Sequence, residues 1–264
     1  MHLSFYKYQG TGNDFVMIDN RQQKFPKNNT KLVARLCDRK FGIGADGMIL
    51  LENDTDTDFK MVYYNADGNE STMCGNGGRC IVAFACFLGI IKENTRFLAI
   101  DGVHHATING DKVRLQMTDV DQIEVFDNYV YLDTGSPHHV QEITDIDNFD
   151  VKKNGEKLRY GKYGKAGSNI NFISRVKDNL FKVRTYERGV EDETLSCGTG
   201  VTAVAIAMHR TGRASGNLIS LDTPGGTLSV SFEEKAGKYA KVFLEGPAMQ
   251  VFRGEIDVLK KNIL

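Results

Sequence analysis

Apolar residues recur along the chain at helical spacing in three places. Over 32–37 they follow Asn29 and Thr30, either of which is suited to cap a helix. The stretches 76–88 and 199–211 are small or apolar almost all round, which is typical of helices that are buried on every side. We therefore predict one amphipathic helix and two buried helices.

Between these helices, short apolar and β-branched runs are separated by turn-forming residues. We expect 134–139 to be a loop, while the polar segment 147–165 has no clear period and predicts no element. Strands are predicted at 3–8, 14–19, 48–51, 59–64, 96–100, 104–108, 112–117, 122–126, 129–132, 171–176, 180–186, 218–221, 227–232 and 239–244.

One part of this pattern occurs twice. Residues 59–101 and 181–222 each begin with a Phe-Lys pair, pass through a strand into a Cys-Gly-x-Gly turn, and continue into a small-residue helix and a strand that ends in Asp. A repeat of this size predicts two related α/β halves. We place the first half at 1–118, joined by the C-terminal tail 250–264, and the second half at 119–249.

Composition narrows the class of protein. The chain has 264 residues, 41% of them hydrophobic and 25% charged, as in globular proteins. Its net charge of −1 gives no electrostatic reason to expect nucleic acid or an anionic membrane as a partner. The N-terminus lacks the features of a signal peptide, and the longest apolar run, 81–91, is too short to span a bilayer. We expect a cytoplasmic protein.

The cysteines do not suggest a disulfide framework or a metal site. There are five of them, an odd number, without a Cys-x-x-Cys pair and without histidines at ligand spacing. The glycine-rich turn at 42–47 lacks the Gly-Lys-Ser/Thr ending of a phosphate loop, so it does not predict a nucleotide site.

The two Cys-Gly-x-Gly turns carry the candidate chemistry. A cysteine just before a helix lies at the positive end of the helix dipole, which lowers the pKa of its thiol. The glycines leave backbone N–H groups bare to bind an anion such as a carboxylate. The alternative is that both cysteines are ordinary buried residues, as we assume for Cys37, Cys80 and Cys86. The matched motifs favour function at Cys74 and Cys197.

Two facing thiols suit the inversion of a stereocentre. In pseudo-symmetric halves the two turns can face one another across an interdomain cleft, with one thiol on each side of the substrate. One group then removes the proton from Cα while the other supplies a proton to the opposite face. Without an electron sink such as pyridoxal phosphate, the site must stabilise the developing enolate, and two helix N-termini aimed at one carboxylate would do so.

Longer motifs around the cysteines resemble the diaminopimelate epimerase family. They are Gly-x-Gly-Asn-Asp-Phe at 10–15, Asn-Ala-Asp-Gly with Cys-Gly-Asn-Gly-x-Arg-Cys within 65–80, and Glu-Arg-Gly with Glu-Thr-x-x-Cys-Gly-Thr-Gly within 187–200. They cover essentially the whole chain in the right order. The resemblance implies a cofactor-independent isomerase that interconverts LL- and meso-2,6-diaminopimelate in lysine and peptidoglycan biosynthesis. It also implies a cytoplasmic homodimer and an α+β fold, in which two pseudo-symmetric domains each wrap a mostly antiparallel or mixed sheet around a central helix.

The resemblance also implies roles for individual residues. Cys74 and Cys197 match the catalytic acid/base pair, and His138 and Glu187 match residues that poise the thiols. The positions that match substrate-binding residues are Asn13, Asn65, Gly75, Asn76, Asn169, Glu187, Arg188, Gly198 and Thr199.

Three departures affect the expected substrate contacts. Ser136 stands where the family commonly has Asn, Gly47 stands where many relatives have Gln, and the loop 187–194 is one residue longer than usual. A proline or hydroxyproline racemase-like enzyme is the alternative within the fold, and Arg188 disfavours it because an imino acid has no second charged group. A non-catalytic thiol-redox binding protein is the alternative from another class.

Overall fold

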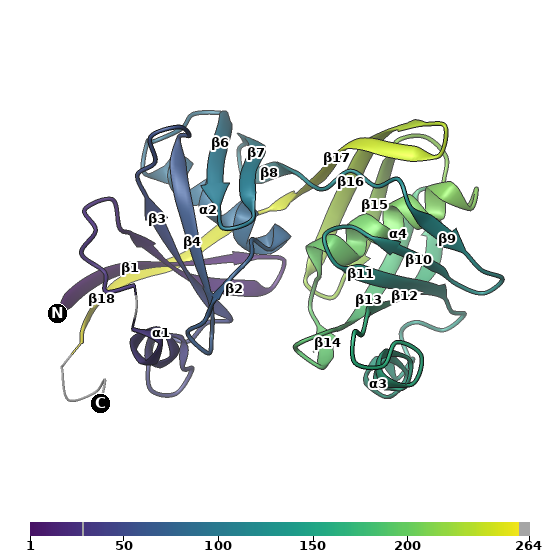
Figure 1. Cartoon of the computed structure of the whole chain (residues 1–264), viewed down its shortest axis with the longest axis horizontal. Helices are drawn as coiled ribbons and strands as arrows, with labels where there is room; N and C mark the ends of the chain where they lie inside the picture. Colours follow the sequence, from purple (N-terminus) through teal and green to yellow (C-terminus); the bar gives the residue numbers. More distant parts are fainter. Residues whose placement is uncertain (28, 259–264) are drawn as a thin grey trace. The chain divides into compact units, whose positions relative to one another are not determined.

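The computed structural model describes residues 1–27 and 29–258 as two compact units (Figure 1). Unit 1 comprises Met1–Leu115 and the chain from Pro247 onward, and unit 2 comprises Gln116–Gly246. Residues 259–264, which our prediction adds to the first half, lie outside the described residues. No helix in the described part of the chain is long and apolar enough to cross a membrane.

The sheet of unit 1 has the strand order β18-β1-β2-β3-β4-β6-β7-β8. The pairs β2–β3 and β4–β6 are parallel and the others are antiparallel, with the short β5 added to β4. The strands are β1 (His2–Gly10), β2 (Asn13–Asp19), β3 (Gly47–Glu52), β4 (Phe59–Asn65), β5 (Glu70–Ser71), β6 (Asn94–Ala99), β7 (Gly102–Asn109), β8 (Lys112–Gln116) and β18 (Met249–Asp257).

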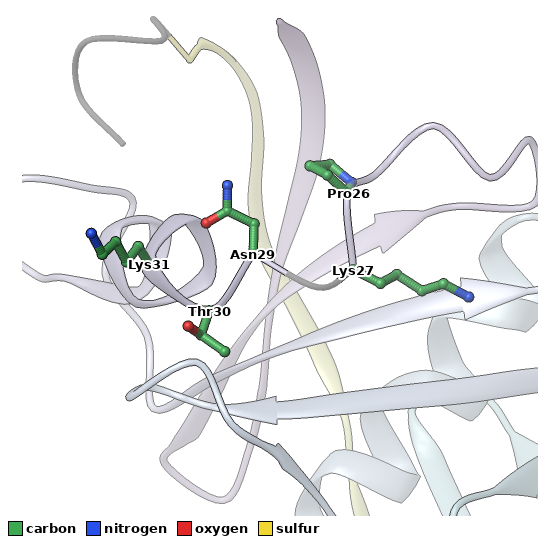
Figure 2. A pocket seen from close by; sticks show the side chains of 5 residues that line it. All are labelled: Pro26, Lys27, Asn29, Thr30 and Lys31. Atoms are coloured by element: carbon green, nitrogen blue, oxygen red, sulfur yellow. The ribbon is translucent and has the colours of Figure 1, made fainter. Parts of the chain in front are cut away.

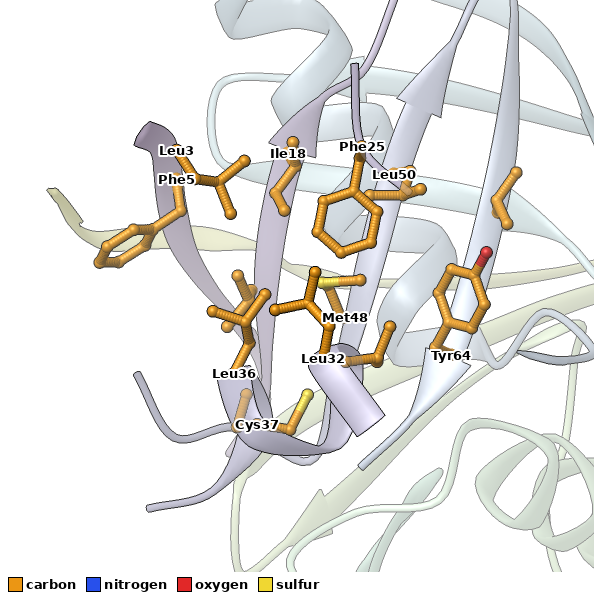
Figure 3. Close-up of a cluster of buried hydrophobic side chains, with 14 of the residues drawn as sticks. Leu3, Phe5, Ile18, Phe25, Leu32, Leu36, Cys37, Met48, Leu50 and Tyr64 are labelled. Atoms are coloured by element: carbon orange, nitrogen blue, oxygen red, sulfur yellow. The ribbon is translucent and has the colours of Figure 1, made fainter. Parts of the chain in front are cut away.

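Two helices cover opposite faces of this sheet. Helix α1 (Thr30–Cys37) packs on one face over a cluster that includes Phe5, Met48 and Leu50 (Figure 3). Of the two predicted caps, Asn29 and Thr30, the N-cap is Asn29, whose side chain accepts a hydrogen bond from the Leu32 N–H at 2.9 Å. Because β2 and β3 are covered on both faces, their sequences are continuous apolar runs instead of alternating ones.

Helix α2 (Gly75–Phe87) is the central helix of unit 1. It contacts β1, β2, β3 and β7, so the sheet curls around it. Its first turns are closely packed: a Cβ on Gly78 would lie 2.7 Å from Met73 Sδ and 2.8 Å from Leu115 Cδ2. The small residues that mark this helix in the sequence are therefore a packing requirement.

Unit 2 repeats the same arrangement. Its strand order is β9-β10-β11-β12-β13-β15-β16-β17, with parallel pairs β11–β12 and β13–β15, and the short β14 added to β13. Helix α4 (Gly198–Arg210) is the central helix, and α3 (Val151–Gly161) takes the place of α1. The strands are β9 (Ile123–Val125), β10 (Val130–Asp133), β11 (Pro137–Glu142), β12 (Asn169–Lys177), β13 (Leu180–Glu187), β14 (Asp192–Thr194), β15 (Leu218–Thr223), β16 (Gly226–Lys235) and β17 (Lys238–Pro247).

The sequence patterns miss five elements, of which β5 and β14 are only two and three residues long. Helix α3 lies within the polar segment 147–165. It was not predicted because its buried face includes Gly155 and Arg159, and neither residue type signals burial in a sequence. The predicted loop at 134–139 is partly wrong, since β11 begins at Pro137 and pairs in parallel with β12. Strand β18 is mostly exposed on both faces and has no apolar alternation.

The contact between α3 and β13 gives a test of this packing. A Cβ on Gly155 would lie 2.4 Å from Tyr186 Cβ and 2.5 Å from Tyr186 Cγ, close to the backbone of β13. We expect Gly155→Ala to lower the free energy of unfolding by about 1–3 kcal/mol. Gly161 is the matched control in the same helix, because a Cβ there meets nothing within 4 Å. Gly161→Ala should be neutral or stabilise by up to about 1 kcal/mol. Urea denaturation of both variants measures this, and equal stabilities would contradict the packing.

Candidate active site

Cys74 is the N-cap of α2. Its backbone is extended, with φ −103° and ψ 150°, and its Sγ accepts a hydrogen bond from the Gly77 N–H at 3.2 Å. The sulfur therefore lies at the N-terminus of the helix, where free N–H groups and the helix dipole favour negative charge. This is the environment that activates a thiol.

A chain of polar side chains lies beside Cys74. Asn13 Nδ2 donates to Asp46 Oδ2 at 2.7 Å, Asn76 Nδ2 donates to Asn13 Oδ1 at 3.5 Å, and Arg79 Nη2 donates to Asn76 Oδ1 at 3.0 Å. The carboxylate at one end and the guanidinium at the other fix the orientation of both amides. Asn13 and Asn76, two of the predicted substrate-binding residues, are thus brought together next to Cys74.

Arg79 is a site residue that the sequence reasoning missed. It is fully buried, and its other hydrogen bonds run to Gly75 O at 3.1 Å, to Thr11 Oγ1 at 3.1 Å and to Pro247 O at 3.4 Å. No carboxylate among the described residues forms a salt bridge with it. Burial lowers the pKa of Arg79 to about 10, so the side chain is still a cation at neutral pH. Two signals were available: Arg79 is the Arg of the Cys-Gly-Asn-Gly-x-Arg-Cys motif, and it is the single charged residue of an otherwise small and apolar helix.

An ionic network holds the turn that carries Asn13. Asp14 accepts from Lys7 Nζ at 2.6 Å and from Arg39 Nη2 at 2.7 Å, and Arg39 also donates to Asp46 at 2.8 Å. Burial acts to raise the pKa of Asp14, but the hydrogen bonds from Arg39 and Lys7 outweigh it and bring the pKa down to about 2. The turn is therefore held by ionised side chains over the whole physiological pH range.

Asn65 and Gly47 lie opposite each other in the register of β3 and β4. Asn65 is exposed and begins the turn closed by Gly68, whose φ of 89° and whose close approach to Thr30 O both require glycine. A Cβ on Gly47 would lie 2.7 Å from Tyr63 Cε2 and 2.6 Å from Tyr64 O. The Tyr63 ring thus occupies the space that a larger residue at position 47 would need.

In unit 2, Cys197 is the N-cap of α4 and is only 7% exposed. Its Sγ lies 3.4 Å from Thr199 Oγ1. A Cβ on Gly200 would lie 2.5 Å from Asn171 Oδ1 and 3.2 Å from Cys197 Cβ, so the glycine allows β12 to approach the turn. The second Cys-Gly-x-Gly turn therefore has the same placement as the first.

His138 is fully buried on β11 and is joined to this turn through Ser136. Its Nδ1 accepts from Asn171 Nδ2 at 3.1 Å, which leaves Nε2 to carry the proton and donate to Ser136 Oγ at 3.0 Å. Ser136 Oγ lies 3.4 Å from Thr199 Oγ1. Burial, with a smaller contribution from the Arg188 charge, lowers the pKa of His138 to about 3, so the imidazole is neutral at physiological pH.

Asn169 connects the same group to the loop after β13. Its Nδ2 donates to Ser136 Oγ at 3.1 Å, and its Oδ1 accepts from the Arg188 N–H at 2.8 Å. The Arg188 guanidinium is exposed and donates to Ala166 O at 2.9 Å, and Glu187 is the last residue of β13. In the sequence, Ser136 is notable only as a departure from the family pattern. In the structure it forms hydrogen bonds with His138 and Asn169.

The predicted site residues divide between the two units. Unit 1 contains Asn13, Asn65, Cys74, Gly75 and Asn76, while unit 2 contains His138, Asn169, Glu187, Arg188, Cys197, Gly198 and Thr199. Each unit therefore presents one thiol at a helix N-terminus, together with polar side chains suited to an amino acid substrate.

A surface hollow elsewhere on unit 1 contains none of these residues. It is lined by Pro26, Lys27, Asn29, Thr30 and Lys31 at the start of α1 (Figure 2). Two of its polar groups serve the fold, since Asn29 caps α1 and Lys27 is paired with Glu52 at 3.0 Å. Within residues 1–27 and 29–258, no group of three or more His, Cys, Asp or Glu side chains is arranged to hold a metal ion.

Solved structures of several enzyme types share this fold. A PhzF-family phenazine biosynthesis protein from Bacillus anthracis has a TM-score of 0.79 at 12% identity, covering 98% of this chain and all of that one. A probable proline racemase from Agrobacterium radiobacter has a TM-score of 0.70 at 18% identity, covering 98% of this chain and 93% of that one. At these identities the similarity establishes the two-domain α+β fold and says nothing of the substrate.

Sequence comparison is more specific. The family model for diaminopimelate epimerase matches residues 5–123 and 130–251. The diaminopimelate epimerase of Flavobacterium psychrophilum is 62% identical over 256 residues, covering 96% of this chain and 100% of that protein. The Chlorobaculum tepidum enzyme of the same name is 42% identical over 258 residues, covering 94% of this chain and 98% of that protein. These matches confirm the resemblance carried by the two cysteine motifs, and the chain belongs to the diaminopimelate epimerase family.

Proposed function

We propose that this protein is an isomerase that interconverts LL- and meso-2,6-diaminopimelate without a cofactor, in lysine and peptidoglycan biosynthesis. The observation that carries the proposal is the 62% identity to a diaminopimelate epimerase over its full length. The placement of both Cys-Gly-x-Gly turns at helix N-termini supports it.

In this proposal Cys74 and Cys197 are the acid/base pair. One thiolate takes the proton from one face of Cα, and the other thiol gives its proton to the opposite face, which inverts the centre. After one turnover the first sulfur is a thiol and the second is a thiolate. The reverse reaction uses the same two groups in exchanged roles.

The helix N-termini stabilise the charge that develops during proton removal. The α-proton of an amino acid is weakly acidic, so the enolate must be stabilised through the α-carboxylate. We assign this to the backbone N–H groups of Gly75 and Asn76 in unit 1 and of Gly198 and Thr199 in unit 2.

The neutral His138 acts as a positioning residue. With its pKa at about 3, it cannot accept a proton usefully near pH 7. Its hydrogen bond orients Ser136, whose hydroxyl lies 3.4 Å from Thr199 Oγ1, and that hydroxyl is in turn 3.4 Å from Cys197 Sγ. His138 would thereby poise the second thiol through two intervening hydroxyl groups.

Charged and amide side chains would bind the rest of the substrate. Diaminopimelate has a second carboxylate and a second amino group, for which Arg188 and Glu187 supply the two opposite charges. Asn13, Asn65 and Asn169 would donate and accept the remaining hydrogen bonds. A proline racemase-like activity is less well supported, because an imino acid offers no partner for Arg188.

Proton NMR in D₂O tests substrate and reaction together. Reduced protein is incubated with LL-2,6-diaminopimelate without pyridoxal phosphate, and we expect the α-proton signal to decay while meso product appears. Protein whose thiols have been alkylated is the control and should produce neither change. Absence of exchange would refute the proposed substrate, and exchange with proline or hydroxyproline instead would favour the racemase.

Serine substitutions test the two-thiol mechanism. We expect Cys74→Ser and Cys197→Ser each to lower kcat by about 10²–10⁴-fold, because a hydroxyl is a far weaker base than a thiolate. Circular dichroism should show an unchanged fold. Cys86→Ser is the matched control: Cys86 lies at the other end of α2, with its thiol 3.7 Å from Lys92 O, and activity should be retained. Near-normal turnover by either active-site variant would exclude the pair.

We further propose that the protein is a cytoplasmic homodimer, with the second copy bound along β18. In the described part of the chain β18 pairs with β1 alone, and three of its apolar side chains are about half exposed: Met249, Val251 and Phe252 at 50%, 58% and 47%. A long edge strand with exposed apolar side chains favours pairing with another strand. Two copies of β18 can pair antiparallel about a two-fold axis.

A charge placed on β18 tests this contact. We expect Val251→Lys to weaken dimerisation by about tenfold or more, because pairing would bury the ammonium group. Val176→Lys is the control, since Val176 is 49% exposed on β12 of unit 2. Sedimentation equilibrium measures both variants. A wild-type protein that stays monomeric, or a dimer unaffected by Val251→Lys, would exclude the contact.

A further inference from the structure

The two cysteine turns differ in charge at one matched position. Five residues after each cysteine stands Arg79 in α2 and Thr202 in α4. Both side chains are fully buried. The repeat therefore places a cation against the first turn of one helix and a neutral hydroxyl against the first turn of the other.

Both side chains perform the same structural task. Arg79 Nη1 donates to Gly75 O at 3.1 Å, and Thr202 Oγ1 donates to Gly198 O at 2.9 Å. A hydroxyl therefore suffices to satisfy this carbonyl of the first helical turn. The guanidinium of Arg79 is not required for that bond. Its other acceptors, Pro247 O, Thr11 Oγ1 and Asn76 Oδ1, are also neutral, so the charge of Arg79 has no anionic hydrogen-bond partner among the described residues.

The charge of Arg79 acts on Cys74. Burying a cation without a carboxylate is costly, and the resulting desolvation is the largest effect on the pKa of Arg79. Ionised Cys80 and Cys74 act in the opposite direction and raise it. Such an interaction is reciprocal, so a thiolate at position 74 is stabilised by the guanidinium as much as it stabilises the guanidinium.

The other ionisable groups near Cys74 do not cancel this charge. Burial raises the pKa of Cys80 and of Tyr8 far above neutrality, so both are uncharged. Asp101 accepts from the Met73 N–H at 3.4 Å, but it is also paired with His104 at 3.2 Å and about one third exposed.

Asp14, which lies on β2, is neutralised by its ion pairs with Lys7 and Arg39, and Asp46, which binds Asn13, is paired with the same Arg39. The fields of these two carboxylates at the cysteine turn are therefore weak compared with that of the guanidinium of Arg79, which has no carboxylate partner among the described residues.

Around Cys197 the charges are different. His138 is neutral, with a pKa of about 3. Arg188 is an exposed cation whose field is screened by water, and the acidic Glu187 precedes it in the chain. Within the described residues of unit 2, the first turn of α4 thus has no buried cation comparable to Arg79.

We propose that Arg79 is the positioning residue that makes Cys74 the thiolate of the resting enzyme, while Cys197 rests as the thiol. The inference rests on the proposed acid/base pair, and it adds which member removes the first proton. Arg79 acts in two ways: it orients Asn76 through the 3.0 Å bond to Oδ1, and it supplies a fixed positive charge at the first turn of the helix that Cys74 caps, 3.1 Å from Gly75 O.

The first test compares the two thiols directly. Iodoacetamide alkylation is followed against pH by site-resolved mass spectrometry, for Cys74 in the Cys197→Ala protein and for Cys197 in the Cys74→Ala protein. Removing one thiol separates two titrations that would otherwise be coupled. We expect alkylation of Cys74 to be half-maximal about one pH unit or more below that of Cys197. The reverse order, or equal midpoints, would overturn the proposal.

The second test changes the charge itself. Arg79→Met should lower the alkylation rate of Cys74 at pH 7 by about threefold or more and move its pH profile upward. Arg79→Lys keeps the charge and should restore most of the rate. Thr11→Val is the matched control, because it removes the 3.1 Å bond to Arg79 but leaves the cation in place. If Arg79→Met, Arg79→Lys and Thr11→Val change the alkylation of Cys74 equally, the role of Arg79 is merely structural.

These measurements are independent of the proposed reaction. Alkylation needs no substrate, so a protein that fails to epimerise diaminopimelate can still show the shift at Cys74. If Arg79→Met does not fold, the comparison of the two thiols in proteins that retain Arg79 still decides the question.

Discussion

Each unit depends on a helix that is buried on almost every side and begins at a cysteine. The first N–H groups of a helix have no partner within it, and in a buried position they require one. In α2 the Cys74 sulfur accepts one of these bonds, from Gly77. Small residues let the sheet close around the rest of the helix, so the position of the thiol is set by the packing of the whole unit.

The repeat shows which parts of the site follow from the fold and which are added to it. Both sheets have the same order of parallel and antiparallel pairs, and both central helices begin at a cysteine. The polar surroundings differ: the first thiol has the Asp46–Asn13–Asn76–Arg79 chain, while the second has Thr199, Ser136 and His138. The scaffold thus supplies two similar sites for a thiol, and the side chains around them supply different electrostatic environments.

The elements that the sequence predicted are those whose local pattern agrees with their burial. Helices α1, α2 and α4 have apolar or small residues where they pack, and α1 has its cap at Asn29. Strand β11 was not predicted because two of its three buried residues are His138 and His139, which have hydrogen-bond partners on β12 and on the loop after α3. In the candidate site, too, a local sequence pattern does not show which distant residues a side chain contacts.

The motif spacing identified Cys74 and Cys197, but not the contacts that join Ser136 to Thr199 or Arg79 to Asn76, since these depend on residues far apart in the chain or on an unexpected buried charge. The roles of the predicted site residues stay predictions. What the structure adds is which of them share hydrogen bonds within each unit.

The charge difference between the two turns has a consequence for turnover. When Cys74 is a thiolate, the buried guanidinium of Arg79 has an anion to interact with, and when Cys74 is protonated that interaction is lost. In the mechanism we propose, the form of the enzyme left after one turnover, with the proton on Cys74, is then higher in free energy than the resting form. An enzyme cannot alter the equilibrium between two isomers. The free-energy difference therefore changes only the relative populations of the two protonation forms of the free enzyme. One isomer meets the thiolate already in place, and the other must bind the less populated form or wait for the proton to move between the thiols.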